Sequence, residues 1–426
     1  MGTLSVDKLM KTSTGAAEFT LPATDGTAGQ VLQTDGSGQL SVAALAADTV
    51  TATQIAADAV GTSEIAANAV TASEIAASTI TPAQMANSAF LANRNIVQNG
   101  AMQIAQRATT ATGETGSNAY TTCDRWRFSL FNDATYTSSQ ETLTAGNAFA
   151  DGFRKAFRVD CTTANASPIA GSGFVIQQRI EGYNAQGLKK GTANAESTTI
   201  SFWVKSNLTG NYSFGLFDKD NDRNIWQLYT ISAADTWEKK TITFAGDTTG
   251  GTLNNDNNAG LEMWWYLGAG TDYTSGTLQT SWGANVWANN AAGQTVSMAS
   301  STANDWAITG VQLEIGTTAT PFEHKSFGEE LAICKRYYDK ETTTTPFQGF
   351  VESGDDYGGN IWFTTTMRAT PTITSTHVTS HKFPGTNPPT SEIMKRKFFS
   401  YKTADGSSSG STSGYYRMSW TADADL

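Results

Sequence analysis

The sequence is poor in charged residues. Only 16% of its 426 residues are Asp, Glu, Lys or Arg, against roughly 25% in an average soluble domain. It nevertheless contains 11 Trp, 13 Tyr and 20 Phe, which are enough large side chains to bury real cores, so we do not expect disorder of the whole chain. A neutral, polar and aromatic-rich composition favours many short strands and turns over long solvated helices.

Basic residues are scarce as well. The formal net charge is −11, and no Lys or Arg occurs between Lys11 and Arg94. The long-range field of such a chain repels phosphate backbones. We therefore expect no nucleic-acid partner.

Cysteine pairs and long apolar runs are also missing. Cys123, Cys161 and Cys334 are odd in number and form no C-x-x-C pair, so they resemble neither a disulfide framework nor a zinc site. The first residues lack the apolar stretch of a signal peptide, and no run reaches the roughly 18 apolar residues of a membrane span. We expect a chain that folds in a cytoplasm and does not insert into a membrane.

A ten-residue repeat occupies residues 42–92. An apolar residue recurs at every fifth position, a step that gives one stripe on neither a helix nor a strand. Thr71 and Glu74 form one of several S/T-x-x-E/Q capping boxes, so each unit is predicted to be a short helical turn followed by an extended step. The apolar positions are Val50, Ile55, Val60, Ile65, Val70, Ile75, Ile80 and Met85.

Two apolar groups per ten residues cannot bury themselves within one chain, so the repeat must associate around an axis or stay disordered. The strict register favours a trimeric stalk, with a flexible Ala-rich linker as the alternative. Residues 1–41 precede it and carry Asp-Gly turns at Asp25 and Asp35. These turns predict a small hairpin-like head or attachment segment, although a simple lead-in to the stalk fits the sequence equally well.

Alternating strand patterns dominate residues 93–325. Ile200, Phe202 and Val204 share one face of such a strand, and strands at this spacing without amphipathic helices predict an antiparallel, jelly-roll-like β-sandwich. Gly310 interrupts the alternation of the strand from Asp305 to Ile315, which indicates a bulge. Trp264 and Trp265 must point to opposite faces of their strand, so at least one of them is expected in the core.

A docking helix and a second β region are expected after the sandwich. Ser326 and Glu329 form a capping box that opens an amphipathic helix over residues 326–340. A Thr-rich connector from Glu341 then leads into a small β tip, residues 341–426. Its strands are predicted at 360–367, 370–376, 397–402 and 415–420, with a Gly/Ser loop at 406–414.

The chain offers little for catalysis. Of its three His, His377 and His381 lie four apart in a Thr- and Pro-containing stretch that opposes the helix a metal pair would need. The G-x-S-x-G match beginning at Gly406 lies in a low-complexity tract without the strand-turn-helix context of a nucleophile. We expect no enzymatic activity and no organic cofactor.

One acidic loop has the spacing of a calcium ligand set. Asp218, Asp220 and Asp222 alternate in FDKDNDRN, as oxygen ligands do when a loop wraps Ca²⁺. Arg223 stands where an EF-hand needs Gly, so a polar hairpin loop is the competing interpretation.

A sugar site is predicted between residues 273 and 290. Sugars stack their C–H faces on aromatic rings, and their hydroxyls need fixed donors and acceptors. Core packing of each Trp is the alternative. The candidate ligand-binding residues are Tyr273, Trp282, Asn285, Trp287 and Asn289, with Asn290 beside them.

Several segments resemble a domain common in bacteriophage tail fibres. The first is NRNIVQNGAMQIAQR at residues 93–107, followed by Asp124-Arg125-Trp126. The most specific is ITGVQLEIGTTATPFEHKSFGEELAICKRYYDK at residues 308–340. FWVKSN, TWEKKTITFAGDTTG, MRATPTI and SWTADADL are similar to further fibre elements, as are the decads and LPATDGTAGQVLQTDGSGQLS.

The resemblance implies a homotrimeric virion fibre whose β-sandwich is akin to a carbohydrate-binding module. Such a fibre is made in the host cytoplasm, joins the virion tail through tail adaptor or nozzle proteins, and contacts a host cell-surface glycan or lipopolysaccharide. Two alternatives remain, a structural connector between the tail and another fibre and a polysaccharide depolymerase.

Overall fold

The computed structural model describes residues 8–10, 18–23, 27–28, 30–34, 37, 39–44, 93–115, 120–131, 134–165, 167–404 and 412–426. The chain divides into two compact units, Met1–Met85 and Ala86–Leu426. The apolar positions of the predicted stalk, Val50 to Met85, lie outside the described residues. Among the described residues, no helix is both long enough and apolar enough to cross a membrane.

The first unit contains two antiparallel strand pairs. Strand β1 (Lys8–Met10) pairs with β2 (Glu18–Thr20), and β3 (Gln30–Thr34) pairs with β4 (Leu40–Ala44). In the second pair Thr34 lies opposite Leu40. The strands therefore flank the second Asp-Gly dipeptide, where the sequence predicts a hairpin.

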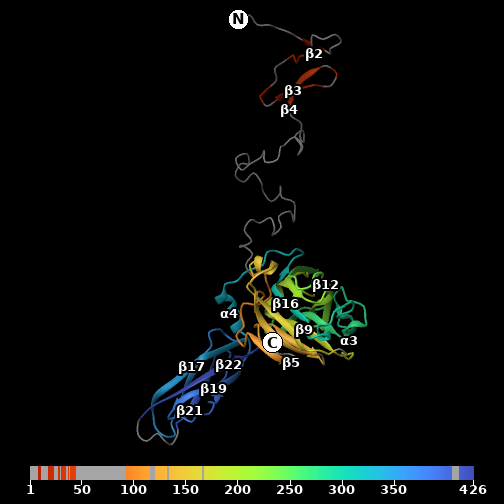
Figure 1. Cartoon of the computed structure of the whole chain (residues 1–426). Coiled ribbons are helices and arrows are strands. Elements are labelled where there is room, and N and C mark those ends of the chain that lie inside the picture. Colours follow the sequence, from red (N-terminus) through yellow and green to blue (C-terminus); the bar gives the residue numbers. More distant parts are fainter. Residues whose placement is uncertain are drawn as a thin grey trace. The chain divides into compact units, whose positions relative to one another are not determined.

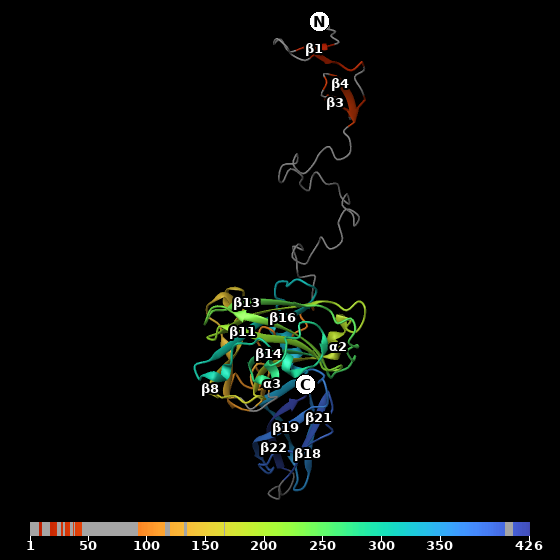
Figure 2. The same cartoon turned by 90° about the vertical axis from the view of Figure 1, so that its right-hand side faces the viewer.

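The second unit begins with a β-sandwich of two six-stranded antiparallel sheets, seen from two directions in Figures 1 and 2. One sheet has the order β13-β10-β16-β8-β7-β5, and the other has the order β15-β12-β11-β14-β9-β6. The fold is mainly β, as the composition and alternation predict. The strands are β5 (Thr110–Glu114), β6 (Arg127–Phe131), β7 (Thr135–Thr142), β8 (Lys155–Thr163), β9 (Gly173–Glu181), β10 (Thr198–Ser206), β11 (Gly210–Asp218), β12 (Arg223–Ile231), β13 (Glu238–Phe244), β14 (Ala259–Ala269), β15 (Gly283–Ala284) and β16 (Asp305–Ile315).

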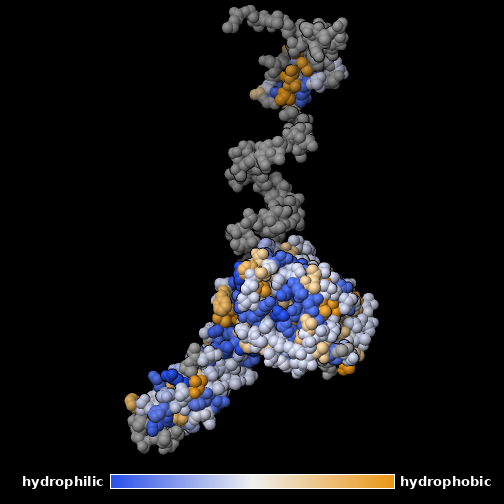
Figure 3. All heavy atoms as spheres, in the orientation of Figure 1, coloured by the Kyte–Doolittle hydropathy of each residue, from blue (hydrophilic) through white to orange (hydrophobic). Residues whose placement is uncertain are grey.

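Short helical turns connect these strands. They are α1 (Asn147–Ala150), α2 (Gly182–Ala185), α3 (Thr271–Thr274), and the 3₁₀ turns η2 (Gln186–Leu188), η3 (Trp287–Asn289) and η4 (Met298–Ser300). The face of the second unit seen in Figure 3 is mostly hydrophilic to neutral, with scattered apolar spots. The apolar side chains of the alternating strand that carries Ile200, Phe202 and Val204 are buried.

Aromatic side chains fill the space between the sheets. Trp265 lies at their centre, with ring centroids 4.5 Å from Phe214, 5.8 Å from Phe202 and 5.5 Å from Trp126. Trp264 points to the other side of β14 and belongs to a separate buried cluster. The prediction that the two rings face opposite ways is confirmed, and both are buried.

The bulge at Gly310 is also confirmed. Pairing between β10 and β16 shifts register where Gly310 and Val311 lie opposite Phe202. Gly310 has φ +61°, and an added Cβ would lie 2.5 Å from the Phe153 ring. Glycine is the residue that reaches this backbone region without steric cost.

Helix α4 (Phe327–Lys335) is shorter than the predicted 326–340. Its start is as expected, because the Ser326 hydroxyl accepts a hydrogen bond from the Glu329 N–H at 3.2 Å. Its end differs because Tyr337 is fully buried and Tyr338 begins strand β17 (Tyr338–Val351). The predicted Thr-rich connector is therefore a strand, as its β-branched residues favour.

The C-terminal β region packs two three-stranded sheets, β17-β22-β19 and β18-β21-β20. Its strands are β18 (Asp356–Trp362), β19 (Thr372–His381), β20 (Thr390–Ser391), β21 (Lys397–Thr403) and β22 (Thr412–Asp423). Phe363, Phe398 and Trp420 lie in its core. The predicted 360–367 strand ends five residues early, at Trp362, and residues 412–414 of the predicted loop belong to β22.

An arginine-rich junction joins this region to the sandwich. The buried Arg125 guanidinium lies 3.5 Å from the centre of the Tyr337 ring and donates to Asp425 at 2.9 Å. Arg107 forms ion pairs with Asp425 at 2.5 Å and with Asp423 at 2.9 Å. Arg125 belongs to the Asp-Arg-Trp element of the sequence.

Candidate functional site

The three carboxylates of the predicted calcium loop do not converge. They lie at the β11–β12 hairpin, which is the competing interpretation of the sequence. Asp218 is buried against Lys190, Asp220 accepts from the Asn254 side chain at 2.9 Å, and Asp222 accepts from Asn285 at 3.3 Å. Within the described part of the chain, no three His, Cys, Asp or Glu side chains are grouped to hold a metal ion.

A buried ionic cluster accounts for the position of Asp218. Lys190, with a side chain 4% exposed, pairs with Asp218 and with Asp247, which lies 2.9 Å away. Arg223 donates to Asp247 from both Nε and Nη2 at 2.9 and 3.2 Å. Burial alone would raise the pKa of Asp247, but hydrogen bonds from Arg223 and Lys190 lower it to about 2.

Trp282 contacts this cluster, Asn285 bonds the β11–β12 hairpin, and Asn289 bonds the segment that follows α3. The Lys190 ammonium lies 5.0 Å from the centre of the Trp282 ring, and the Trp282 indole N–H donates to the Ala245 carbonyl at 2.8 Å. Asn285 accepts from Asn224 at 2.8 Å, and Asn289 accepts from the Thr277 N–H at 3.0 Å. Asn290, which lies beside them in sequence, is fully buried. None of these four residues lines the cavity at which the other two candidates, Tyr273 and Trp287, lie.

Tyr273 and Trp287 do lie together, on one open cavity of about 570 Å³. Their rings are 6.3 Å apart and nearly perpendicular, at 85°. Trp287 is 47% exposed. The cavity is formed by the end of β6, by α3 and by η3, and its lining residues are Phe131, Asp272, Tyr273, Ser275, Trp287 and Ala288.

The Tyr273 and Trp287 rings both pack against other aromatic rings of the protein. Trp287 packs on Trp264 at 6.1 Å between centroids, and Tyr273 packs on Tyr266 at 5.7 Å. The two loops are also bonded to each other, because Ala291 N–H donates to the Tyr273 carbonyl at 2.9 Å and Gly276 N–H donates to the Ala288 carbonyl at 2.9 Å. Fixed rings lose little conformational freedom when a ligand binds.

Polar groups complete the cavity. Asp272 and Ser275 make no side-chain hydrogen bond within the described residues, so their oxygens are available to a ligand. Partial burial and then the nearby Asp272 carboxylate raise the pKa of Tyr273, which keeps its hydroxyl a neutral donor at pH 7. Ring faces beside free oxygens can stack a pyranose and accept its hydroxyls.

Of the six residues that line this cavity, the sequence predicted two, Tyr273 and Trp287. Asp272 adjoins Tyr273 in sequence, so the neighbourhood of the predicted aromatic was a usable signal. Ser275 follows in the same polar stretch. Phe131 comes from β6, on another part of the chain, and no local pattern connects it to Tyr273.

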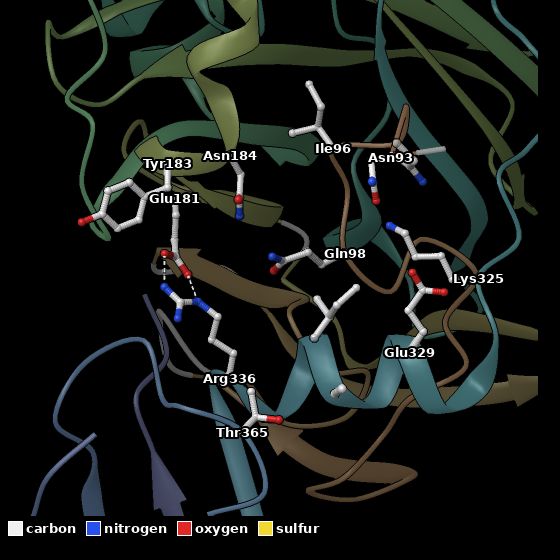
Figure 4. Close-up of a pocket in the computed structure, with 13 residues that line it drawn as sticks. Asn93, Ile96, Gln98, Glu181, Tyr183, Asn184, Lys325, Glu329, Arg336 and Thr365 are labelled. Carbon is white, nitrogen blue, oxygen red and sulfur yellow. Dashed lines mark hydrogen bonds and ion pairs between the residues drawn. The ribbon is translucent and has the colours of Figure 1, made fainter. Parts of the chain in front are cut away.

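A second cavity, of about 660 Å³, was not predicted at all (Figure 4). Arg336 at the end of α4 forms two hydrogen bonds with Glu181, at 2.8 and 2.7 Å, while Lys325 and Glu329 project from the other side of the cavity. Gln98 receives a bond from Arg125 at 2.7 Å and donates to Tyr337 at 3.0 Å. Several polar residues that line this second cavity are therefore already hydrogen-bonded within the protein.

No protein-family model matches the chain, and no curated protein matches it. Among solved structures, it is similar to the enzymatically active domain of tailspike protein 4 of bacteriophage CBA120, with 14% identity and a TM-score of 0.25. That match covers 52% of this chain and 22% of the tailspike chain.

Two further solved structures are matched over nearly their whole length. A sugar-binding protein of Bacteroides thetaiotaomicron, described as putative, has 13% identity and a TM-score of 0.29, covering 52% of this chain and 100% of its own. The family 11 carbohydrate-binding module of Clostridium thermocellum, solved with a mixed-linked β-1,3-1,4 tetrasaccharide, has 14% identity and a TM-score of 0.24, covering 49% and 99%. The function proposed below rests on the residues of this chain.

Proposed function

We propose that the protein is a non-enzymatic bacteriophage tail fibre that attaches the virion to its host through a surface glycan. The cavity between Tyr273 and Trp287 is the observation that carries the binding part of this proposal. The sequence resemblance to tail-fibre segments supports the virion part, with tail adaptor or nozzle proteins as the partners on the particle.

In the proposed mode of binding, the exposed Trp287 ring supports the C–H face of a sugar, with Tyr273 closing one side. The Asp272 carboxylate and the Ser275 hydroxyl accept or donate hydrogen bonds at the sugar's hydroxyl groups. Phe131 adds apolar surface at the far wall. No Lys or Arg lines this cavity, so a neutral glycan fits it better than an anionic one.

A single shallow site of this kind binds weakly. The decad repeat predicts a homotrimer, which would present three such sites per fibre. Linked sites raise the overall avidity by about 10² to 10⁴ without any new contact. Several fibres on one virion would then give firm adsorption.

The test is a competition for adsorption. Recombinant full-length protein is expected to block adsorption of the virus, and Trp287→Ala is expected to remove the blocking. Val286→Ala is the matched control, because Val286 neighbours Trp287 and is equally exposed, at 47%, but does not line the cavity.

Other outcomes would assign other functions. Protein that stays on the particle but neither binds cells nor blocks adsorption would indicate a structural connector. Release of reducing ends from host polysaccharide would indicate a depolymerase. Equal blocking by the Trp287→Ala and wild-type proteins would refute the proposed cavity.

A further inference from the structure

An exposed aromatic surface lies on the outer face of the β18–β21 pair in the C-terminal region. Trp362 is opposite Lys397, and Asn360 is opposite Phe399. The alternate residues Ile361 and Phe398 are buried in the core, so the first set points outward. Trp362 is 65% exposed, which is unusual for so large an apolar side chain.

Three consecutive cations lead into strand β21, and the last of them, Lys397, lies beside this ring. Lys395, Arg396 and Lys397 lie in a chain whose net charge is −11. Lys395 and Arg396 are exposed. Within the described residues none of the three forms an ion pair, so the three positive charges are available to an external anion.

Lys397 is held in place beside Trp362, and the two preceding cations are fixed through other bonds. The Lys397 ammonium donates to the Asn360 side-chain oxygen at 2.8 Å and lies 5.5 Å from the centre of the Trp362 ring. The Arg396 Nε donates to the Thr366 hydroxyl at 3.2 Å. Their backbone is fixed too, because Phe363 N–H donates to the Arg396 carbonyl at 2.9 Å and Met367 N–H donates to the Lys395 carbonyl at 2.7 Å.

We propose that this surface, the Trp362 platform (Asn360, Trp362, Lys395, Arg396, Lys397 and Phe399), binds an anionic saccharide. The sugar ring stacks on Trp362, and its carboxylate or other acidic group accepts a charge-assisted hydrogen bond from Lys397, while Lys395 and Arg396 add positive charge at the same end of the strand. The chemistry is opposite to that of the Tyr273–Trp287 cavity, where the charged lining residue is Asp272. The platform is a second site, and its ligand binding does not depend on the function proposed above.

Charge complementarity selects this occupant. A long polyphosphate backbone would meet the acidic remainder of the chain beyond the three cations, which disfavours nucleic acid. Pairing of this surface with the same surface of a second copy is disfavoured, because both carry positive charge. A short acidic sugar satisfies both the exposed ring and the unpaired cations.

The experiment is isothermal titration of the full-length protein with three probes. These are trigalacturonic acid, neutral galactotriose and inorganic tripolyphosphate. Trigalacturonic acid is expected to bind at least about tenfold more tightly than either of the others, because only it supplies both a ring and an anion. Binding should weaken as salt is raised.

Variants separate the two contributions. Trp362→Ala and Lys397→Gln are each expected to weaken trigalacturonate binding about tenfold. Phe350→Ala and Arg417→Gln are the controls, an exposed aromatic and an exposed cation of the same region outside the platform, and both should bind normally. Trp287→Ala should also bind normally, which separates this site from the neutral-glycan cavity. Circular dichroism establishes that each variant is folded.

Four results would overturn the proposal. The first is no heat with trigalacturonic acid. The second is equal binding of tripolyphosphate together with no effect of Trp362→Ala, which would reduce the surface to a charge patch. The third is tighter binding of a single-stranded oligonucleotide, titrated as a further probe under the same conditions. The fourth is a change of oligomeric mass in the Lys397→Gln protein by light scattering, which would assign the surface to an interface between copies.

Discussion

At the scale of single residues, the buried ionic cluster beside Trp282 shows how this charge-poor chain uses charged side chains in its interior. Lys190 forms ion pairs with Asp218 and Asp247, which lie on separate segments. Arg223 forms the third ion pair of the cluster, also with Asp247. Buried charges of this kind are tolerated only when paired and hydrogen-bonded. The cluster positions the Trp282 ring and the β11–β12 hairpin.

Replacing Asp247 with Asn should therefore destabilise the protein, by about 3 kcal/mol, because it leaves Lys190 and Arg223 partly uncompensated. The pKa of Asp247 is about 2 in the folded protein, below its value of about 3.9 in an unfolded chain. The carboxylate thus contributes stability above pH 4 and loses it as the pH falls toward 2.

Urea denaturation of the Asp247→Asn and wild-type proteins between pH 2 and 7 measures the contribution of Asp247 to the free energy of unfolding. The difference between the two proteins should be largest at neutral pH and shrink in acid. Asp220→Asn is the control, because Asp220 bonds only neutral partners. A difference that stays constant from pH 2 to 7 would contradict the assigned role of Asp247.

At the scale of elements, the bulge in β16 sets which side chains of that strand face the core on each side of Gly310. Gly310→Ala should cost about 2 to 4 kcal/mol, because it combines a strained positive φ with a clash against Phe153. Chemical denaturation gives the loss.

Gly328→Ala is the matched control for that substitution. An added Cβ at Gly328 in α4 would meet nothing within 4 Å, so this variant should be neutral or stabilised by up to about 1 kcal/mol. Equal behaviour of the two variants would show that the bulge does not need glycine.

Local patterns in the sequence predicted elements better than sites. Alternation at Ile200, Phe202 and Val204 identified a core strand because strand periodicity is a property of neighbouring residues. The end of α4 was missed because the burial of Tyr337 against Arg125 is a tertiary contact. Trp282 has the composition of a sugar ligand, but only the fold shows Lys190 beneath it.

At the scale of the whole molecule, the arginine junction couples the sandwich to the C-terminal β region. Asp425→Asn should destabilise the protein by about 3 kcal/mol, because Arg125, with a side chain 0% exposed, would lose its counter-ion. Calorimetry of the full chain measures the change.

Asp423→Asn is the control for the junction. Asp423 is 47% exposed where it meets Arg107, so its loss should cost less than about 1 kcal/mol. If Asp423→Asn greatly lowered the free energy of unfolding and Asp425→Asn did not, the roles given to the two carboxylates would be reversed.

The oligomeric state is predicted from the decads alone. Light scattering of the full chain should give three times the chain mass, and the double variant Ile65→Asn, Ile75→Asn should reduce it, because polar groups replace apolar ones at the repeat positions. Thr71→Ser, Ala72→Ser in the same decads is the control. If light scattering gives the mass of a single chain for the wild-type protein, the trimer prediction is wrong and the repeat is a linker.

The arginine junction also sets an order of events during synthesis. Arg125 and its partner Asp425 are separated by 300 residues. At the roughly 5 to 20 residues per second of translation, Arg125 leaves the ribosome about 15 to 60 seconds before its counter-ion does. Until then Arg125 has its neutral partners Gln98, the Arg179 carbonyl and Tyr337 but no counter-ion. A chain terminated before Asp425 would therefore leave this cation uncompensated and this part of the fold more exposed to chaperones and proteases.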